Sequence, residues 1–284
     1  MIRIVFIILF QFFLICAFAQ KNPAYQLYNT KGNKVSYKKM VRKLKKADVI
    51  LFGEHHDNPI SHWLQLELTN SLYKERDLTL GAEMIETDNQ QYLDQYLAKE
   101  IDQKGLDSLA RLWKNYPTDY APLVDFARNH DIRFIGTNIP RRYASMVYKG
   151  GFEALDTLHP HEKAWIAALP IAYDPELPGY LAMLEMGGMH GGENLPKAQA
   201  IKDATMAESI DENFEEGRLF LHFNGSYHSD NYEGILWYLR RIAPERDYRT
   251  ITTVSQVDVT RLEDQYERRA DFIICVPENM TKTY

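Results

Sequence analysis

The sequence predicts an α/β protein with one mostly parallel sheet, flanking helices and a helical insertion that forms a lid. Two observations predict the sheet. Short apolar runs end in glycine or in a polar residue, and stretches with helical periodicity separate these runs. The third observation predicts the insertion, because residues 140–217 contain no convincing strand and read as helices broken by Pro and Gly.

The first 19 residues are expected to be a secretory signal peptide. Arg3 precedes an apolar stretch, and Ala17-Phe18-Ala19 forms a small-residue cleavage site. A retained membrane anchor is disfavoured, because Gln11 interrupts a stretch that is already short for a membrane span. A lipoprotein anchored through Cys16 is weaker still, because Ile15 is bulky where a small residue is expected. We therefore expect an exported protein with a single α/β domain over residues 20–284.

The elements of this domain follow in a regular order. Tyr25–Tyr37 reads as a small hairpin that turns at Lys31-Gly32-Asn33. The expected strands are Asp48–Gly53, Leu78–Met84, Ile132–Asn138, Leu219–Asn224, Thr250–Val254 and Asp271–Val276. The expected helices outside the insertion are Tyr37–Ala47 capped by Ser36, Pro59–Glu75, one capped by Asp88 that contains Tyr92 to Leu97, two stretches that run on to His130, and Asp230–Arg241.

The insertion, at about residues 140–217, is expected to cover the sheet as a lid. Its clearest helices are Leu158–Leu169, Glu176–Met186 and Leu195–Phe214. It holds most of the methionines and the glycine-rich loop Gly187-Gly188-Met189-His190-Gly191-Gly192. Methionines on such helices are more often core residues than the lining of a cofactor pocket.

Composition limits the possible partners. The 284 residues carry a formal net charge of −6, and an acidic surface does not favour nucleic acid. Cys275 is the only cysteine left once the signal peptide is removed, so neither an internal disulfide nor a cysteine-based metal site is expected. The side chains available for chemistry are His, Glu, Asp and Tyr, and tyrosine is abundant at 18 residues.

Polar side chains gather where the predicted strands end. Glu54 and His56 follow the strand that ends at Gly53, Glu83 closes the next strand, and His228 follows Asn224-Gly225. The carboxyl ends of parallel strands face one crevice, so the two Gly-x-x-His loops and the two glutamates should meet there. Such a set can perform acid/base catalysis, and His56, His228 and Glu83 can ligate a divalent metal.

Other polar residues have simpler interpretations. Asp57 and Asn58 precede Pro59 and are expected to cap a helix. His62 reads as a helix surface residue, and His159 and His161, which flank Pro160, read as exposed. For His190 the sequence leaves two roles open, a hinge in the lid or a ligand.

These residues carry a family resemblance. It rests on several pieces in order: Leu51-Phe52-Gly53-Glu54-His55-His56-Asp57-Asn58-Pro59 with Gln65 downstream, Gly81-Ala82-Glu83-Met84, Asn138-Ile139-Pro140-Arg141, Gln199 with Lys202-Asp203-Ala204-Thr205-Met206-Ala207, Gly225-x-x-His228, and Ala270-Asp271-Phe272-Ile273-Ile274. The chain resembles the ChaN-like haem-binding uptake family. The wider group includes Tiki-type metal-dependent proteases, TraB proteins and erythromycin esterases, which share paired Gly-x-x-His loops and a strand-end glutamate.

The resemblance implies an α/β core with a helical subdomain, in a protein that is periplasmic or associated with the outer membrane. It implies haem binding in haem or iron uptake, with tyrosine as an iron ligand, subunits that pair as a homodimer around stacked haems, and a membrane transporter as a possible partner. The haem would be non-covalent, because no Cys-x-x-Cys-His motif is present. From the composition of the lid, Tyr180 and His190 are the ligands to test first.

The sequence leaves open whether the protein is an enzyme. The favoured hypothesis is that it binds haem or another small molecule. The alternative is a metal-dependent hydrolase, in which His56, His228 and a carboxylate hold the metal while Glu54 or Glu83 activates water. A structural module without a site would leave the residues at the strand ends unexplained. Haem binding needs a wide apolar slot, whereas hydrolysis needs the His and Glu side chains around one point.

Overall fold

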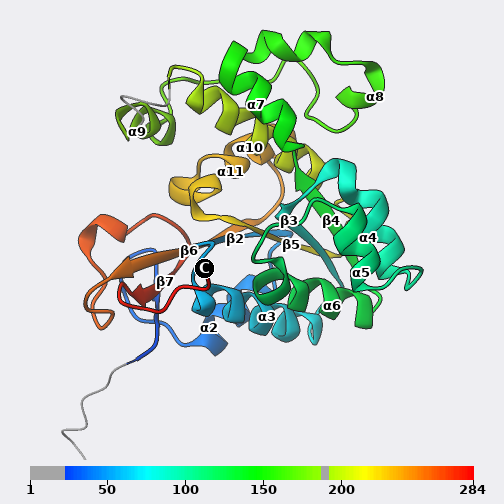
Figure 1. The fold of residues 1–284 in the computed structure, drawn as a ribbon. Coiled ribbons are helices and arrows are strands. Elements are labelled where there is room, and N and C mark those ends of the chain that lie inside the picture. The colour runs from blue at the N-terminus through cyan, green and yellow to red at the C-terminus, as the bar shows by residue number, and fades with distance from the viewer. Residues whose placement is uncertain (1–22, 187–191) are drawn as a thin grey trace, which may run out of the picture.

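The computed structural model describes residues 23–186 and 192–284, and in these residues one seven-stranded sheet forms the centre of the molecule (Figure 1). The strands lie in the order β1-β7-β6-β2-β5-β3-β4. Their bounds are β1 Gln26–Asn29, β2 Val49–Glu54, β3 Leu78–Glu86, β4 Arg133–Asn138, β5 Leu219–Gly225, β6 Tyr248–Gln256 and β7 Phe272–Pro277. All neighbouring pairs are parallel except β1 with β7, which confirms the mostly parallel α/β fold.

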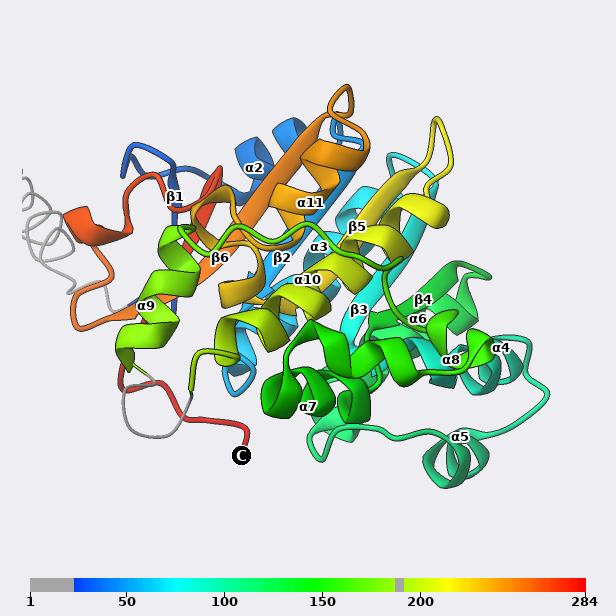
Figure 2. The ribbon, with the colours of Figure 1, turned by 90° about the horizontal axis from the view of Figure 1, so that it is seen from above.

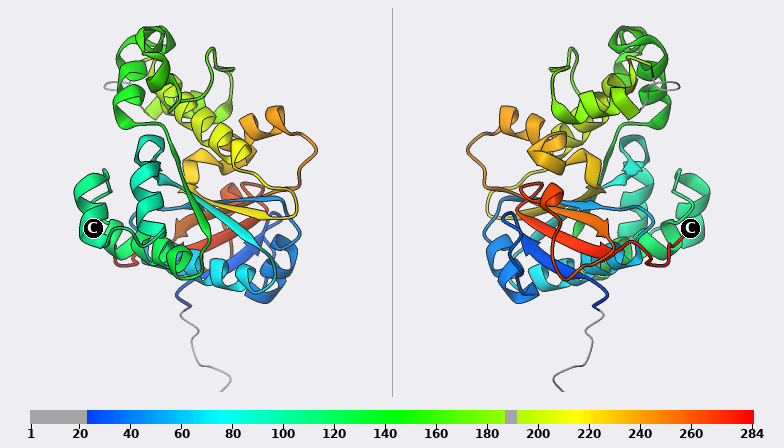
Figure 3. Two further views of the ribbon diagram at one scale, coloured as in Figure 1. Left: turned by 90° about the vertical axis from the view of Figure 1, so that its right-hand side faces the viewer. Right: turned by 90° about the vertical axis from the view of Figure 1, so that its left-hand side faces the viewer.

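Helices cover both faces of this sheet, as Figure 3 shows. The first face carries α2 Tyr37–Leu44, α3 Pro59–Tyr73, α4 Gln90–Leu97, α5 Gln103–Leu109 and α6 Ala121–Asn129, and the second face carries α7 Arg141–Gly150, α10 Leu195–Glu212 and α11 Ile235–Ile242. Strand β2 shows how one sequence serves both faces. Ile50 and Phe52 pack in the first core, while Val49 and Leu51 pack in the second, because successive side chains of a strand point to opposite sides.

The position of β5 creates the crevice that the sequence predicts. Strand β5 lies between β2 and β3, although it follows them both in the chain. The chain leaves β2 and β3 towards the first face and leaves β5 towards α11 on the second face. Connections that part in this way open a crevice at the carboxyl ends of the strands, and here they part on both sides of β5.

Within residues 140–186 and 192–217 the structure contains helices and no strand. Besides α7 and α10 this segment contains α8 Pro160–Lys163 and α9 Pro178–Met186, and Figure 1 shows α7 and α8 above α10 and α9 beside it. Helix α10 packs against β4 and α11, and Figure 2 shows it lying over the sheet, roughly along the strands. Met183 of α9 and Leu195 at the start of α10 border the cavity at the carboxyl edge of the sheet.

The sequence predicts a helix over Leu158–Leu169, but the structure has only one short helix there, α8. Helix α8 ends at Lys163. The amide of Ala167 donates to Thr205 Oγ1 at 3.1 Å, and the amide of Ala168 donates to Glu208 Oε2 at 2.8 Å. These amides therefore bond side chains of α10 rather than carbonyl groups one turn earlier in their own segment, and tertiary contacts override the local helical periodicity.

Three further local expectations need correction. Strand β1 pairs with β7, and the expected hairpin is reduced to one bridge between Tyr28 and Lys34. The helix expected from Asp230 begins only at Ile235, because Gly234 adopts a φ of +56° that breaks the helix. Asp88 does not cap α4 but forms ion pairs with Arg111 and Arg142.

The expected signal peptide, residues 1–19, lies outside the described residues. Among the residues that are described, no helix has both the length and the apolar character needed to cross a bilayer.

Candidate functional site

The carboxyl ends of β2, β3 and β5 bring the four predicted residues Glu54, His56, Glu83 and His228 together. The Gly225 amide donates to Glu83 Oε2 at 2.7 Å, and His228 Nε2 lies 3.2 Å from Glu83 Oε1. His56 lies over Gly225, where an added Cβ would be only 2.7 Å from His56 Nε2. The two Gly-x-x-His loops therefore meet around Gly225, where the absence of a side chain lets His56 approach the backbone closely.

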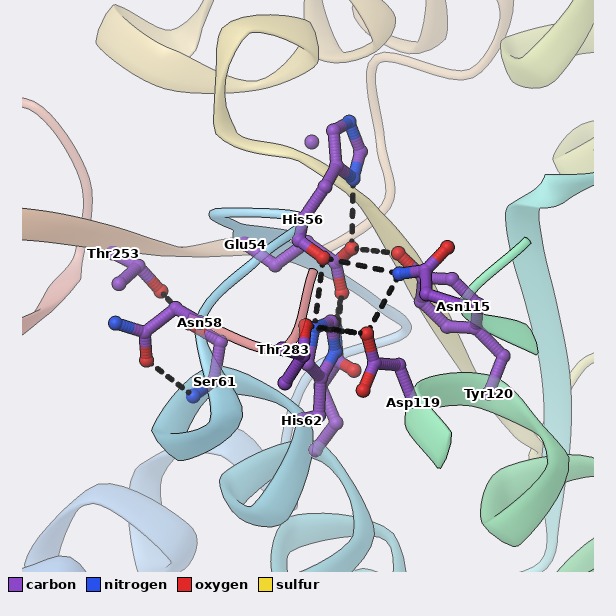
Figure 4. Close-up of polar contacts among 12 residues, drawn as sticks. Glu54, His56, Asn58, Ser61, His62, Asn115, Asp119, Tyr120, Thr253 and Thr283 are labelled. Atoms are coloured by element: carbon purple, nitrogen blue, oxygen red, sulfur yellow. Dashed lines mark hydrogen bonds and ion pairs between the residues drawn. The ribbon is translucent and has the colours of Figure 1, made fainter. Parts of the chain in front are cut away.

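Glu54 organises the first of these loops (Figure 4). This buried carboxylate accepts hydrogen bonds from His56 Nδ1 at 2.8 Å, from the Tyr120 hydroxyl at 2.7 Å and from Gln65 Nε2 at 2.5 Å. Burial alone would raise the pKa of Glu54, but the bonds and charges of His56 and His62 outweigh it and lower the pKa to about 2. Glu54 is therefore ionised at neutral pH and holds the His56 ring with Nδ1 towards itself.

His62 was expected on the surface and is instead part of this network. His62 is only 7% exposed, and its ring lies between two carboxylates. Nδ1 is 3.4 Å from Glu54 Oε2, and Nε2 is 3.4 Å from Asp119 Oδ2 (Figure 4). Burial lowers the pKa of His62, but these carboxylates raise it above its ordinary value. The periodicity of α3 gave no sign of this, since the partners come from another part of the chain.

The sequence predicts that both Asp57 and Asn58 cap α3, and the structure shows this role for one of them. Asn58 is the N-cap of α3, and its side-chain oxygen accepts from the amides of Ile60 and Ser61, which confirms the expected cap. Asp57 does not share that role, because its carboxylate pairs with Lys282 at 2.9 Å. His159 and His161 are both exposed, as expected.

The second loop places His228 in a more enclosed setting. His228 Nδ1 is 2.5 Å from Asp203 Oδ1 on α10, and its other ring nitrogen faces Glu83. Burial would lower the pKa of His228, but the charges of Glu83 and Asp203 outweigh it and raise the pKa to about 9. His228 is therefore a buried imidazolium between two carboxylates, and all three side chains are nearly inaccessible.

Several residues of the site were given no role by the sequence. Asp203 belongs to the Lys-Asp-x-Thr-Met-Ala motif, which is the only signal that could have found it. Asn115, Asp119 and Tyr120 come from the segment around the short helical turn Tyr116–Tyr120, where no strand or periodic pattern marks them.

A cavity of about 870 Å³ opens over these loops. Its wall combines carboxylates and imidazoles from the strand ends with aromatic and apolar side chains. The Trp113 ring packs edge-on against His56 at 4.9 Å between centroids, and Tyr227 is 57% exposed at the cavity surface. The residues that line this cavity include Glu54, His56, Glu83, Glu86, Trp113, Ile139, Arg141, Met183, Tyr227, His228 and Tyr284.

The two residues predicted from the lid have different positions. Tyr180, in α9, is 4% exposed, does not line this cavity, and its hydroxyl donates to Asp203 Oδ2 at 3.3 Å. Iron ligation by Tyr180 would therefore require the loss of this bond. His190 lies outside the described residues.

The geometry does not support the predicted divalent-metal site of His56, His228 and Glu83. Within residues 23–186 and 192–284, no group of three or more His, Cys, Asp or Glu side chains is arranged to hold a metal ion. Glu83 and His228 bond each other directly, and the other nitrogen of His228 faces Asp203. A shared metal would have to replace these contacts.

Comparison with known proteins supports the fold and the family. The fold is similar to that of ChaN from Campylobacter jejuni, a solved structure of cofacial haem binding, with a TM-score of 0.67, 20% identity, and coverage of 90% of this chain and 98% of that one. An erythromycin esterase mutant in its open conformation is similar at a TM-score of 0.53 and 10% identity, covering 90% and 98% of the two chains. At these identities the likenesses show the fold alone.

Among curated proteins, RETICULATA-RELATED 5, a chloroplastic protein of Arabidopsis thaliana, is 28% identical over 126 residues. The match covers 42% of this chain and only 17% of that protein. The family model described as haem-binding uptake, Tiki superfamily, ChaN matches residues 40–239, which include both Gly-x-x-His loops and Asp203. Since this match covers most of the chain, the protein belongs to the ChaN family of haem-binding uptake proteins in the Tiki superfamily.

Proposed function

We propose that this protein binds haem non-covalently at the carboxyl edge of the sheet and serves haem or iron uptake in the cell envelope. The observation that carries the proposal is the cavity of about 870 Å³, whose wall joins Trp113, Met183 and Ile139 to phenol and imidazole groups. Sites for small ligands and cofactors have volumes of about 300–1,000 Å³ and mostly apolar walls with a few polar groups. Membership of the family and the haem complex of the similar Campylobacter ChaN support the same ligand.

Tyr227 and His56 are the first candidates for iron ligands, because both line the cavity. Phenolate and imidazole are each established haem ligands in proteins. Glu54 holds His56 Nδ1, which fixes the ring orientation and makes Nε2 a stronger donor. His228 is less suited, since both of its nitrogens face buried carboxylates. The proposal thus moves the first test from Tyr180 to Tyr227 and retains His190 as a further candidate.

A haem titration of the purified mature protein tests this proposal. Saturable binding with a shifted Soret band is expected. Tyr227→Phe or His56→Ala should change the position of that band, because one of these residues contacts iron. Tyr148→Phe is the matched control, since Tyr148 is an exposed tyrosine of α7 outside the cavity lining. Absence of a saturable shift in the wild type would refute haem binding, and a change only in Tyr180→Phe or His190→Ala would return the ligand to the lid.

The proposed location rests on the N-terminal sequence. An apolar stretch that ends in Ala17-Phe18-Ala19 supports export and cleavage before Gln20. N-terminal sequencing of the protein recovered from the cell envelope should therefore begin at Gln20. A homodimer and a membrane transporter partner stay predictions from the family resemblance, and sedimentation with and without haem tests the first of them.

One observation favours hydrolysis as a second candidate. His56 has Nδ1 bonded to a buried carboxylate, while Nε2 faces the cavity near Glu83. A carboxylate that orients imidazole in this way is the arrangement of a general base. Turnover of a panel of activated esters and amides should then fall about 10²- to 10⁴-fold in His56→Ala. Activity that is equal in wild type and His56→Ala would eliminate this candidate.

A further inference from the structure

A second cavity, of about 960 Å³, adjoins the first cavity over the strand ends, and its wall carries more cations. The two cavities share Glu86, Trp113, Arg141 and Tyr284 in their walls. The second cavity adds the cations Arg111, Lys114 and Arg142, together with the side chains of Leu112, Asn115 and Ser145. Four cations therefore surround one cavity on a chain whose formal net charge is −6.

Two of these cations are neutralised by neighbouring carboxylates. Arg111 donates to Glu86 Oε2 from Nε at 3.0 Å and from Nη2 at 2.8 Å, and it also bonds Asp88. Arg142 Nη1 donates to the other oxygen of Asp88 at 2.6 Å. The remaining oxygen of Glu86 accepts from the Arg141 amide at 3.0 Å, so both carboxylates are already engaged.

Arg141 and Lys114 differ from these two cations. Within the described part of the chain, neither side chain forms an ion pair, and both residues are exposed. The hydrogen bond from the Arg141 backbone N–H to Glu86 fixes the backbone of Arg141 at the start of α7, in the wall common to both cavities. Trp113 and Tyr284 supply an aromatic surface on the same wall.

We propose that Arg141 and Lys114 form an anion-binding subsite that holds the carboxylates of a planar ligand whose apolar body lies in the first cavity. This inference rests on the proposed haem function and assigns the subsite to the two propionate groups of haem. A guanidinium binds a carboxylate through two parallel hydrogen bonds, whereas an ammonium acts as a point charge. The two cations thus fix the direction in which the ligand enters, while Trp113 and Tyr284 contact its flat face.

The test compares haem with haem dimethyl ester, in which both propionates are neutral, in the same detergent-containing buffer. Wild type should bind haem about tenfold more tightly than the ester, because two exposed ion pairs each contribute modestly. Arg141→Gln/Lys114→Gln should bind haem about tenfold more weakly and should not distinguish it from the ester. Raising NaCl from about 50 to about 500 mM should weaken binding of haem to wild type but not to this variant.

Lys104→Gln/Lys149→Gln is the matched control, since it removes the same charge from exposed residues outside both cavities. It should behave as wild type. If haem binds and the Arg141/Lys114 variant matches wild type for both ligands, the subsite is overturned while the proposed function stands. If neither haem nor iron-free protoporphyrin IX binds to wild type, the proposed function fails and the subsite fails with it. Equal weakening in the control variant would also overturn the subsite, because it would show a general charge effect.

Discussion

The two Gly-x-x-His loops have the same spacing but hold their histidines in different environments. His56 takes its carboxylate, Glu54, from its own loop, and a third of its side chain remains exposed at the cavity. His228 takes its carboxylates from β3 and α10, and its side chain is almost completely enclosed. The same local motif therefore gives one histidine that can contact a ligand and one that joins distant parts of the fold. The two environments differ because the carboxylate partner of His56 is close in the chain, whereas those of His228 come from distant segments.

The largest expected effect separates the two histidines by stability. His228→Ala should lower the free energy of unfolding by about 3–5 kcal/mol, because it leaves Glu83 and Asp203 buried without a cation. His56→Ala should cost only about 1 kcal/mol, since Glu54 keeps its bonds from Tyr120 and Gln65. Urea unfolding at pH 7 measures both. Equal losses would show that the two loops are equivalent after all.

The pH dependence of stability should reveal the same contrast. The pKa of His228 is raised to about 9 in the folded protein, whereas that of an unfolded histidine is about 6.5. Its contribution is therefore fully present below about pH 6.5 and is lost as the pH rises through 9, with a total of about 3 kcal/mol. Urea unfolding between about pH 6 and pH 10 should show this loss in wild type and in His56→Gln. A loss of the same size in His228→Gln would assign the titration to another group.

Alanine at the two loop glycines should sharpen the comparison. A Cβ at Gly53 would lie 2.9 Å from Ser226 Cα and 3.0 Å from the Ile251 carbonyl oxygen, and both are backbone atoms. Gly53→Ala should therefore cost about 2–3 kcal/mol. A Cβ at Gly225 meets the tip of the His56 ring, which can rotate away, so Gly225→Ala should cost about 1 kcal/mol and displace His56. Thermal denaturation, with the haem spectrum as a second measurement, tests this order, and a larger loss at Gly225 would contradict it.

The smallest expected difference concerns two tyrosines that serve the two loops. The Tyr120 hydroxyl donates to Glu54 at 2.7 Å, and the Tyr180 hydroxyl donates to Asp203 at a longer 3.3 Å. Tyr120→Phe should therefore destabilise the protein by about 2 kcal/mol, and Tyr180→Phe by about 1 kcal/mol or less. Chemical denaturation of the two variants under identical conditions gives the comparison. A greater loss in Tyr180→Phe would mean that the second loop depends more on its tyrosine.

Much of the sheet could be predicted because its strands are locally encoded. The run Val49-Ile50-Leu51-Phe52 is buried on both faces, and β5 repeats this character before Asn224-Gly225. Such runs, separated by helical patterns, are typical of a parallel sheet. Knowing that the strands are parallel was then enough to bring Glu54, Glu83 and the two histidines to one edge.

The polar network around these residues was not predictable in the same way. His62 looked like a surface residue because its partners, Glu54 and Asp119, are contributed by a strand end and by an irregular segment. The helix expected after Leu158 failed for a similar reason, since its amides bond side chains of α10. Periodicity describes the neighbours of a residue along the chain and carries no information about such distant contacts.

The sequence by itself determined the α/β class, the parallel strands and the meeting of two Gly-x-x-His loops with Glu54 and Glu83. These features depend on apolar runs and on glycine at the turns, which act over a few residues. Only the tertiary structure decided that His56 faces a cavity while His228 is an enclosed imidazolium, and that Arg141 and Lys114 border the same space. Burial and charge at a side chain are set by segments far away in the chain, and these come together only when the fold is complete.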